Sequence, residues 1–201
     1  MTIKTIINNI RLRINDEDRY RWSDEQVLTI VNEAVRFIRN VFLEENPILL
    51  TNGECYGGVL AKGMSRISMP YDVIKYVDVR INGKPIYQES INNIKDIEQT
   101  GTPTAFVPVG SSSAIVHPIP DEEVKWRVIA VRASTDLVEE DDLPFQSDYC
   151  DCVIEYVSMR MSMIDEYDQS VEAQLLGEIR SHIKAKLNDY APKDNVVRAY
   201  Y

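Results

Sequence analysis

The strongest structural pattern in the chain lies in residues 21–47, which read RWSDEQVLTIVNEAVRFIRNVFLEENP. Ser23 and Gln26 have the spacing of a capping box, in which each side chain accepts a hydrogen bond from the other residue's backbone N–H. Pro47 cannot continue a helix. The pattern therefore predicts an amphipathic helix that ends near Glu45 and is about 33 Å long. Its apolar residues recur at steps of three and four and share one face: Val27, Val31, Ala34, Val35, Ile38, Val41 and Phe42.

A helix of this length needs other long helices to cover its apolar face. Residues 2–14 carry isoleucines at helical spacing and are followed by a polar turn, so they should form a hairpin with the helix above. Two further periodic stretches follow residue 143, separated by the turn DEYDQS, and should form a second hairpin. Their apolar residues are Tyr149, Val153, Tyr156, Val157, Met159, Met163 and Ile164, then Val171, Leu175, Leu176, Ile179, Ile183 and Leu187.

The middle of the chain, residues 48–143, has a different pattern, with short apolar runs and most of the glycines and prolines. Residues 125–134 alternate between two faces, which is typical of a strand with one buried side. Asn82 and Gly83 both accept a positive φ and predict a type I′ hairpin turn. We expect an antiparallel β module here, with a short helix over residues 91–100.

These patterns predict an α+β fold in which a β module is inserted into a helical bundle. The bundle domain comprises residues 1–47 and 144–190 and consists of the N-terminal and C-terminal helical hairpins. Residues 48–143 form the inserted β domain. Residues 191–201 lack periodicity and should form an extended C-terminal tail.

The charge of the chain restricts its partners. Thirty-two acidic and 22 basic residues give a net charge of −10, which argues against a protein that grips nucleic acid by its phosphates. DNA can still pass beside an acidic surface without sticking to it. The chain has no apolar run long enough to span a membrane and no secretory signal, so we expect a soluble, cytoplasmic protein. Cys55, Cys150 and Cys152 are expected to be reduced, buried thiols.

The sequence carries no recognisable catalytic or cofactor motif. Residues 109–116, VGSSSAIV, lack the lysine and helix of a phosphate-binding loop and predict a hairpin turn. The acidic residues 16–18 lack the glycine and final glutamate of a calcium loop and should be solvated. His117 and His182 have no ligand partners at metal spacing. We therefore predict a structural or interaction protein with no catalytic residues, metal or cofactor.

Two other functions stay open from the residues alone. Trp126, Tyr87 and Phe106 would suit a carbohydrate-binding or hydrolysing β module as stacking platforms, although aromatic residues in strands more often face the core. A DNA-processing enzyme is disfavoured by the net charge and by the lack of metal ligands.

Four passages occur in a distinctive order: RWSDEQVLTIVNEAVR, then MPYDVIKYVDVRINGKPI, then TGTPTAFVPVG followed by IVHPIPDE, and finally LPFQSDYCDCVIEYVSMRM. In this order and spacing the chain resembles the head-to-tail adaptor (connector) proteins of tailed bacteriophages, which include the tail tubular A proteins of short-tailed phages. The resemblance covers nearly the whole chain. The acidic DEDR loop and EEDD run depart from the family pattern.

The resemblance implies a virion neck protein that is assembled in the host cytoplasm and is not a membrane protein. Such subunits form a homo-oligomeric ring, typically a dodecamer, under the portal protein and above the tail nozzle or tail-hub protein. Double-stranded DNA passes through the channel of this ring without specific binding.

We expect the C-terminal tail to contact the portal. Ordering an aperiodic segment costs about 1 to 2 kcal/mol per residue in backbone entropy, so burial against a partner must offset it. Tyrosine is among the residues that anchor interfaces. The alternative is that the tail folds back onto its own bundle. The predicted contact residues are Val196, Val197, Arg198, Tyr200 and Tyr201.

Overall fold

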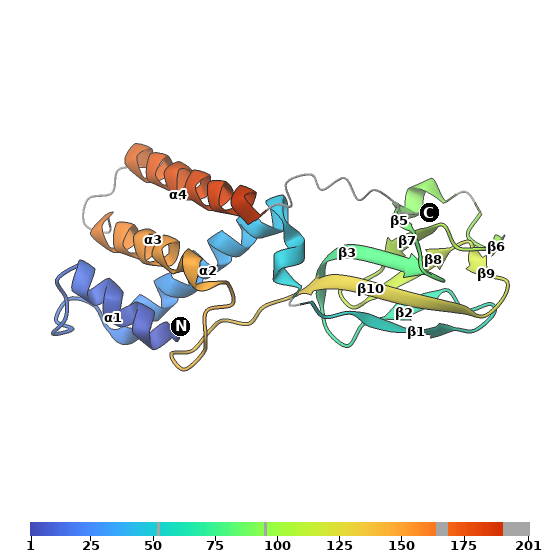
Figure 1. Ribbon diagram of the computed structural model, residues 1–201, viewed down its shortest axis with the longest axis horizontal. Coiled ribbons are helices and arrows are strands. Elements are labelled where there is room, and N and C mark those ends of the chain that lie inside the picture. The colour runs from blue at the N-terminus through green and yellow to red at the C-terminus, as the bar shows by residue number, and fades with distance from the viewer. Residues whose placement is uncertain (52, 95, 164–168, 191–201) are drawn as a thin grey trace. The chain divides into compact units, whose positions relative to one another are not determined.

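The computed structural model describes residues 1–51, 53–94, 96–163 and 169–190. They form two compact units: one contains Met1–Asn46 and the described part of Asp136–Tyr201, and the other contains Pro47–Thr135. Among the described residues, every α-helix belongs to the first unit and every strand to the second (Figure 1). The predicted α+β class is confirmed.

The helical unit contains α1 (Ile3–Arg13), α2 (Asp24–Glu45), α3 (Cys150–Met163) and α4 (Gln169–Tyr190), with a 3-10 turn at Ser147–Tyr149 before α3. The capping box that begins α2 is confirmed. Gln26 N donates to Ser23 Oγ at 3.2 Å, and Ser23 N donates to Gln26 Oε1 at 2.9 Å. The helix ends at Glu45, as the proline two residues later requires.

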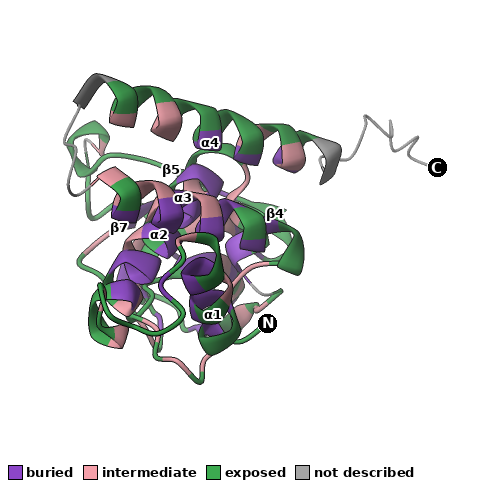
Figure 2. Ribbon diagram, turned by 90° about the vertical axis from the view of Figure 1, so that its left-hand side faces the viewer, coloured by how far each residue is buried: buried purple, intermediate pink, exposed green. Residues whose placement is uncertain are grey.

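The apolar face of α2 is the centre of the helical core. Helix α2 contacts α1, α3 and α4, and α3 contacts α1 and α4. Val27, Val31, Ala34 and Ile38 are all fully buried. Figure 2 shows buried residues on the facing sides of α1, α2 and α3, whereas α4 is exposed over most of its length. In the described part of α4 the buried residues are Ile179, Ile183 and Leu187.

Charged pairs add to the apolar contacts that hold α4. Lys184 Nζ lies 2.5 Å from Glu45 Oε1 of α2, and Arg180 pairs with Glu44 of the same helix. Arg160 of α3 pairs with Glu172 of α4. Because exposed ion pairs contribute little stability, α4 depends mainly on its three buried residues.

The segment before α3 returns to the helical unit earlier than the sequence pattern indicated. Residues 136–143, which the sequence placed in the β domain, cover α1 and α2 instead. The side chain of Asn32 bonds both backbone groups of Leu137, at 2.8 and 3.1 Å. The carbonyls of Asp141 and Glu139 accept the first N–H groups of α1 at 2.9 and 3.0 Å. The acidic run therefore satisfies the donors at a helix N-terminus, where negative charge is favourable.

The β unit consists of two four-stranded sheets and one two-stranded sheet, counting the described residues. The strand orders are β1-β10-β3-β4, β2-β8-β7-β5 and β6-β9. The strands are β1 (Tyr56–Leu60), β2 (Arg66–Ser68), β3 (Val73–Ile81), β4 (Lys84–Pro85), β5 (Tyr87–Gln88), β6 (Thr100–Gly101), β7 (Ala105–Pro108), β8 (Ser113–His117), β9 (Ile119–Pro120) and β10 (Val124–Arg132).

Both larger sheets contribute to one apolar core. Val79 and Val128 from the first sheet cluster with Ile67 and Val116 from the second, and all four are buried. The alternation predicted for β10 is confirmed, since Val128 and Ala130 are buried while Arg127 is exposed. The two sheets therefore pack face to face.

The predicted turn at Asn82-Gly83 is confirmed, but two details of the β module differ from prediction. Asn82 (φ 48°) and Gly83 (φ 79°) connect β3 to β4. The pairings β5–β7 and β6–β9 are parallel, whereas the sequence predicted an antiparallel module. Strands of two residues carry no alternation that would reveal their direction. Among the described residues of 91–100, the helical part is the 3-10 turn Ile91–Asn93.

Candidate functional site

No metal centre is visible in the described part of the chain. Among these residues, no group of three or more His, Cys, Asp or Glu side chains lies close enough together to hold an ion. None of the described helices has the length and hydropathy of a membrane span. The surface features of the described residues include the corner between α1 and α2, a cleft between α1, α3 and α4, and the exposed aromatic residues of the β unit.

The α1–α2 corner, residues 14–23, is held by a buried arginine. Arg11 is only 2% exposed. Its guanidinium donates to Asp16 Oδ2 at 2.7 Å, to Asp24 Oδ1 at 2.7 Å and to the carbonyl of Trp22 at 3.0 Å. Arg19 donates to the other oxygen of Asp24 at 2.7 Å. One buried cation thus fixes the loop at three points.

The expectation that residues 16–18 form a solvated loop is wrong for Asp16. This carboxylate is buried at 6% exposure and also accepts the backbone N–H of Arg21 at 3.0 Å. Glu17 and Asp18 are exposed, as expected. The sequence did carry a signal for the network. Arg11 lies four residues after Ile7, on the apolar stripe of α1, where an unpaired charge would be costly.

The corner presents an aromatic side chain to solvent. Asn15 and Arg19 have positive φ angles of 55° and 60°, which non-glycine residues seldom adopt. Tyr20 follows directly and is 91% exposed, the highest exposure among the large apolar residues of the described chain. The guanidinium of Arg21 lies 5.7 Å from the centre of the Trp22 ring. The network therefore fixes the backbone on both sides of Tyr20 while leaving its ring in water.

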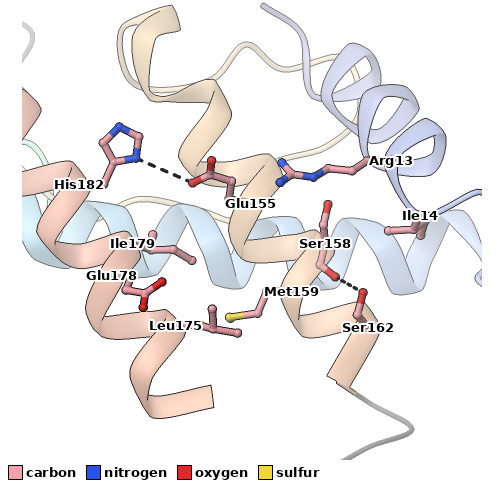
Figure 3. Close-up of a pocket in the computed structure, with 10 residues that line it drawn as sticks. All are labelled: Arg13, Ile14, Glu155, Ser158, Met159, Ser162, Leu175, Glu178, Ile179 and His182. Carbon is pink, nitrogen blue, oxygen red and sulfur yellow. Dashed lines mark hydrogen bonds and ion pairs between the residues drawn. The ribbon is translucent and has the colours of Figure 1, made fainter. Parts of the chain in front are cut away.

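A cleft of about 610 Å³ opens between α1, α3 and α4 (Figure 3). Its apolar wall combines Met159 of α3 with Leu175 and Ile179 of α4. Arg13 of α1 extends across the cleft toward Glu155 of α3. The full lining is Arg13, Ile14, Glu155, Ser158, Met159, Ser162, Leu175, Glu178, Ile179 and His182.

The polar groups of the cleft are incompletely paired. Ser158 is 8% exposed, and its Oγ has no hydrogen-bond partner among the described residues. Buried hydroxyl groups normally have one. His182 Nδ1 lies 3.8 Å from Glu155 Oε2, while Glu178 is exposed beside them. The open part of the cleft thus has an apolar wall and two carboxylates, whereas the Ser158 hydroxyl is buried beneath it.

The aromatic residues that would suit a sugar platform do not form one together. Phe106 is 4% exposed and packs edge-on against Tyr76, with ring centres 5.3 Å apart. The indole of Trp126 covers Gly58 closely, so that a Cβ added there would lie 3.0 Å from it. Tyr87 is 74% exposed. Phe106 is therefore a core residue, and no observation favours the carbohydrate function.

All three cysteines are free, and the prediction that they are buried is correct for two of them. Cys150 and Cys152 are buried, as expected, and burial raises the pKa of both thiols. Cys55 is exposed, contrary to prediction. It lies just before β1, whose second and third residues, Gly57 and Gly58, are exposed glycines that have no side chains to cover it.

The predicted portal contacts, Val196, Val197, Arg198, Tyr200 and Tyr201, lie outside the described residues. No alternative location for that contact follows from the described chain. The corner and the cleft were both absent from the predicted sites. The cleft has no sequence signal, because it is formed by three helices that are distant in the chain.

The described residues define a two-unit α+β protein whose candidate sites are surface features. The chain belongs to the SU10 adaptor protein family, a family of phage head-to-tail adaptors, whose model matches residues 1–198. No curated protein matches the chain. Family membership supports a structural role as an adaptor of the phage neck, associated with portal and tail components.

Proposed function

We propose that this protein is a tail tubular A-like structural subunit that forms an oligomeric ring between the portal protein and the tail and extends the DNA channel. The observation that carries the proposal is the family match over residues 1–198, which leaves almost none of the chain for another function. The ring is typically a dodecamer in the proteins that the sequence resembles. We place the protein in the virion neck after assembly in the host cytoplasm.

The net charge supports a channel that DNA crosses without binding. A chain with a net charge of −10 repels phosphates, and tight binding would oppose DNA movement during ejection. Double-stranded DNA is therefore a passing partner, and no specific contact with it is proposed.

The two units suit a subunit that contacts more than one kind of partner. In this proposal the helical domain, residues 1–46 and 136–190, is a bundle of N-terminal and C-terminal hairpins, with the β domain, residues 47–135, inserted between them. Contacts among α1, α2, α3 and α4 support one shared helical core. A separate β unit leaves a second surface for the tail nozzle or tail-hub protein.

The experiment mixes the purified chain with purified portal protein and measures the complex by native mass spectrometry and electron microscopy. We expect a ring of several copies bound coaxially to the portal. A chain that stays monomeric and unbound with portal present contradicts the proposed function.

We also propose that the tail, residues 191–201, is the docking arm for the portal. The apolar and aromatic residues near its end supply area that burial can use, and an extended segment of this length spans up to about 35 Å. The test is deletion of residues 196–201. We expect the shortened protein to melt as the full chain does and to lose portal binding. Unchanged portal binding contradicts the docking role. It is also the result expected if the tail folds back onto its own bundle.

A further inference from the structure

We propose that the free edge of β1 (Tyr56–Leu60) takes an extended, acidic segment of a tail protein as an additional strand. This inference rests on the proposed neck adaptor and names how its β unit holds the tail. Strand β1 is the outermost strand of its sheet and pairs with β10 on one side (Figure 1). An extended peptide can add to such an edge through main-chain hydrogen bonds.

Strand β1 lacks the features that protect sheet edges in other proteins. Edge strands are usually very short, or they carry charged residues, prolines or bulges. The other outer strands of the two larger sheets follow this rule, since β4 (Lys84–Pro85) and β5 (Tyr87–Gln88) have two residues each and β2 (Arg66–Ser68) has three. Strand β1 has five residues, reading YGGVL, with no charge, no proline and an unbroken register to β10.

The backbone of β10 shows which groups of β1 are used inside the sheet. Both backbone groups of Lys125 bond Asn82 on the β3 side: the N–H donates to Asn82 Oδ1 at 2.8 Å, and the carbonyl accepts the Asn82 N–H at 2.7 Å. Backbone groups alternate in direction along a strand. Those of Trp126 therefore point the other way, toward β1, where Gly58 is its partner in register.

The same alternation places free hydrogen-bonding groups along the outer edge of β1. The backbone groups of Gly58 point toward β10, so those of Gly57 and Val59 point away from the sheet. Neither of these two residues has a backbone partner at that edge within the described chain. All three residues are exposed, Val59 at 54%, so the edge is open to solvent.

A basic side chain beside this edge favours an acidic partner. Arg127 is exposed and lies opposite Gly57 in the register of β1 and β10. Its Nε donates to the Sγ of Cys55 at 2.7 Å, so its guanidinium lies next to the residue that precedes β1. Arg127 forms no ion pair within the described chain. Asp78, the carboxylate that acts on it through space, already pairs with Arg80 at 2.7 Å.

Gly57 leaves the path from the free edge to Arg127 open, because it has no side chain. The close packing of this residue also requires glycine, since a Cβ added there would lie 2.9 Å from the carbonyl oxygen of Trp126. A strand added to β1 would lie two strand spacings from β10, which is about 10 Å. A carboxylate opposite Gly57 on that strand can therefore meet the Arg127 guanidinium in a charge-assisted hydrogen bond.

A second copy of the chain fits this edge less well than a tail protein does. The other free edges of the chain, β2, β4 and β5, are too short to match five residues. Pairing of β1 with the β1 of another copy would place two unpaired Arg127 side chains on one face of the joined sheet, where like charges repel. The tail nozzle or tail-hub protein, which the proposed function places against the β unit, is therefore the source of the strand.

Hydrogen exchange measured by mass spectrometry tests the contact directly. The chain is assembled on portal protein, and purified tail nozzle protein or tail-hub protein is then added. We expect one of the two proteins to slow amide exchange in residues 55–60 by about tenfold or more, because the N–H groups of Gly57 and Val59 become bonded. Peptides that contain β2, an outer strand of the other sheet, should exchange at an unchanged rate.

Two variants separate the backbone contact from the charge. Val59→Pro removes one outward N–H and keeps the bonds to β10, and proline is tolerated on edge strands. Its control, Val59→Thr, keeps the N–H and the shape. Arg127→Gln removes the charge, and its control is Lys84→Gln on β4, at the opposite edge of the same sheet. All three positions are exposed, and circular dichroism and thermal melting check folding.

We expect each test variant to raise the dissociation constant for the tail protein about tenfold, and each control to bind as the wild type does. If Val59→Pro melts early, Arg127→Gln decides the question, because it changes no backbone group. Test variants that bind as tightly as the wild type overturn the inference.

The other results separate this inference from the proposed function. A ring on the portal that binds neither tail protein, or binds one with unchanged exchange in residues 55–60, overturns the inference and leaves the ring standing. Slower exchange in residues 55–60 as the concentration of the free chain rises identifies a second copy as the occupant and also overturns it. A chain that binds neither portal nor tail protein refutes the proposed function, and the inference with it.

Discussion

Replacing Arg11 with methionine removes a buried guanidinium while keeping an unbranched side chain of similar length. The substitution leaves Asp16 as a buried carboxylate that accepts the backbone N–H of Arg21 but has lost its cation. It also breaks the bonds to Asp24 and to the carbonyl of Trp22. We therefore expect Arg11→Met to destabilise the helical unit strongly.

The magnitude follows from the burial of the pair. The side chains of Arg11 and Asp16 are 3% and 5% exposed, so solvent screens their interaction little. Removing one member of such a pair typically costs about 3 to 5 kcal/mol. Asp24 is 35% exposed and adds less. We expect a loss of about 3 to 4 kcal/mol, and the added substitution Asp16→Asn should regain about 1 to 2 kcal/mol by removing the unpaired charge.

The two tryptophans of the chain allow each unit to be followed separately. Trp22 lies in the α1–α2 corner and Trp126 lies in β10 of the other unit. In a Trp126→Phe background, urea unfolding monitored by fluorescence reports on the helical unit alone. This separation is needed because a chain with two units does not have to unfold in one step.

The control is Arg13→Met, which makes the same change two residues away at an exposed position of the same helix. It should shift the free energy of unfolding by less than about 0.5 kcal/mol. An Arg11→Met protein within about 1 kcal/mol of the wild type would refute the buried network. Additive effects of Arg11→Met and Asp16→Asn would show that the two residues do not interact.

Three further predictions test other parts of the fold. Val31→Asp places an unpaired charge on the fully buried face of α2 and should lower the free energy of unfolding by about 3 kcal/mol or more. A variant that melts at the wild-type temperature would show that this face is misassigned. Gly177→Ala in the interior of α4 meets no neighbouring atom within 4 Å and should raise the free energy of unfolding by about 0.5 to 1 kcal/mol; a loss measured by denaturant melting would contradict the open space there. The exposed Cys55 should react with a thiol reagent at pH 8 well before the two α3 thiols, because burial raises their pKa and lowers their thiolate fraction; three equally fast thiols would contradict their burial.

The elements with local signals were predictable from the sequence. Helix α2 begins at its capping box and ends before Pro47, and both signals act within a few residues. The Asn82-Gly83 turn follows from the backbone conformation that only a few residue types accept. Alternation in β10 followed from one buried sheet face.

Features that depend on distant contacts were not predictable. The sequence pattern placed the acidic run at residues 139–142 in the β domain, yet its carbonyls accept the first N–H groups of α1. Charge alone does not distinguish a linker from a segment whose backbone caps a helix. Asp16 looked solvated for the same reason, because its partner Arg11 belongs to the preceding helix. The cleft needs α1, α3 and α4 together and so has no local signal.

The most direct measurement of the proposed role is electron cryomicroscopy of the purified chain assembled on portal particles. We expect class averages with an added ring, coaxial with the portal, whose density accommodates one helical unit and one β unit per copy around an open channel. Portal particles that are unchanged after incubation with the folded chain, with all of the chain remaining monomeric, would contradict the assignment as a neck adaptor.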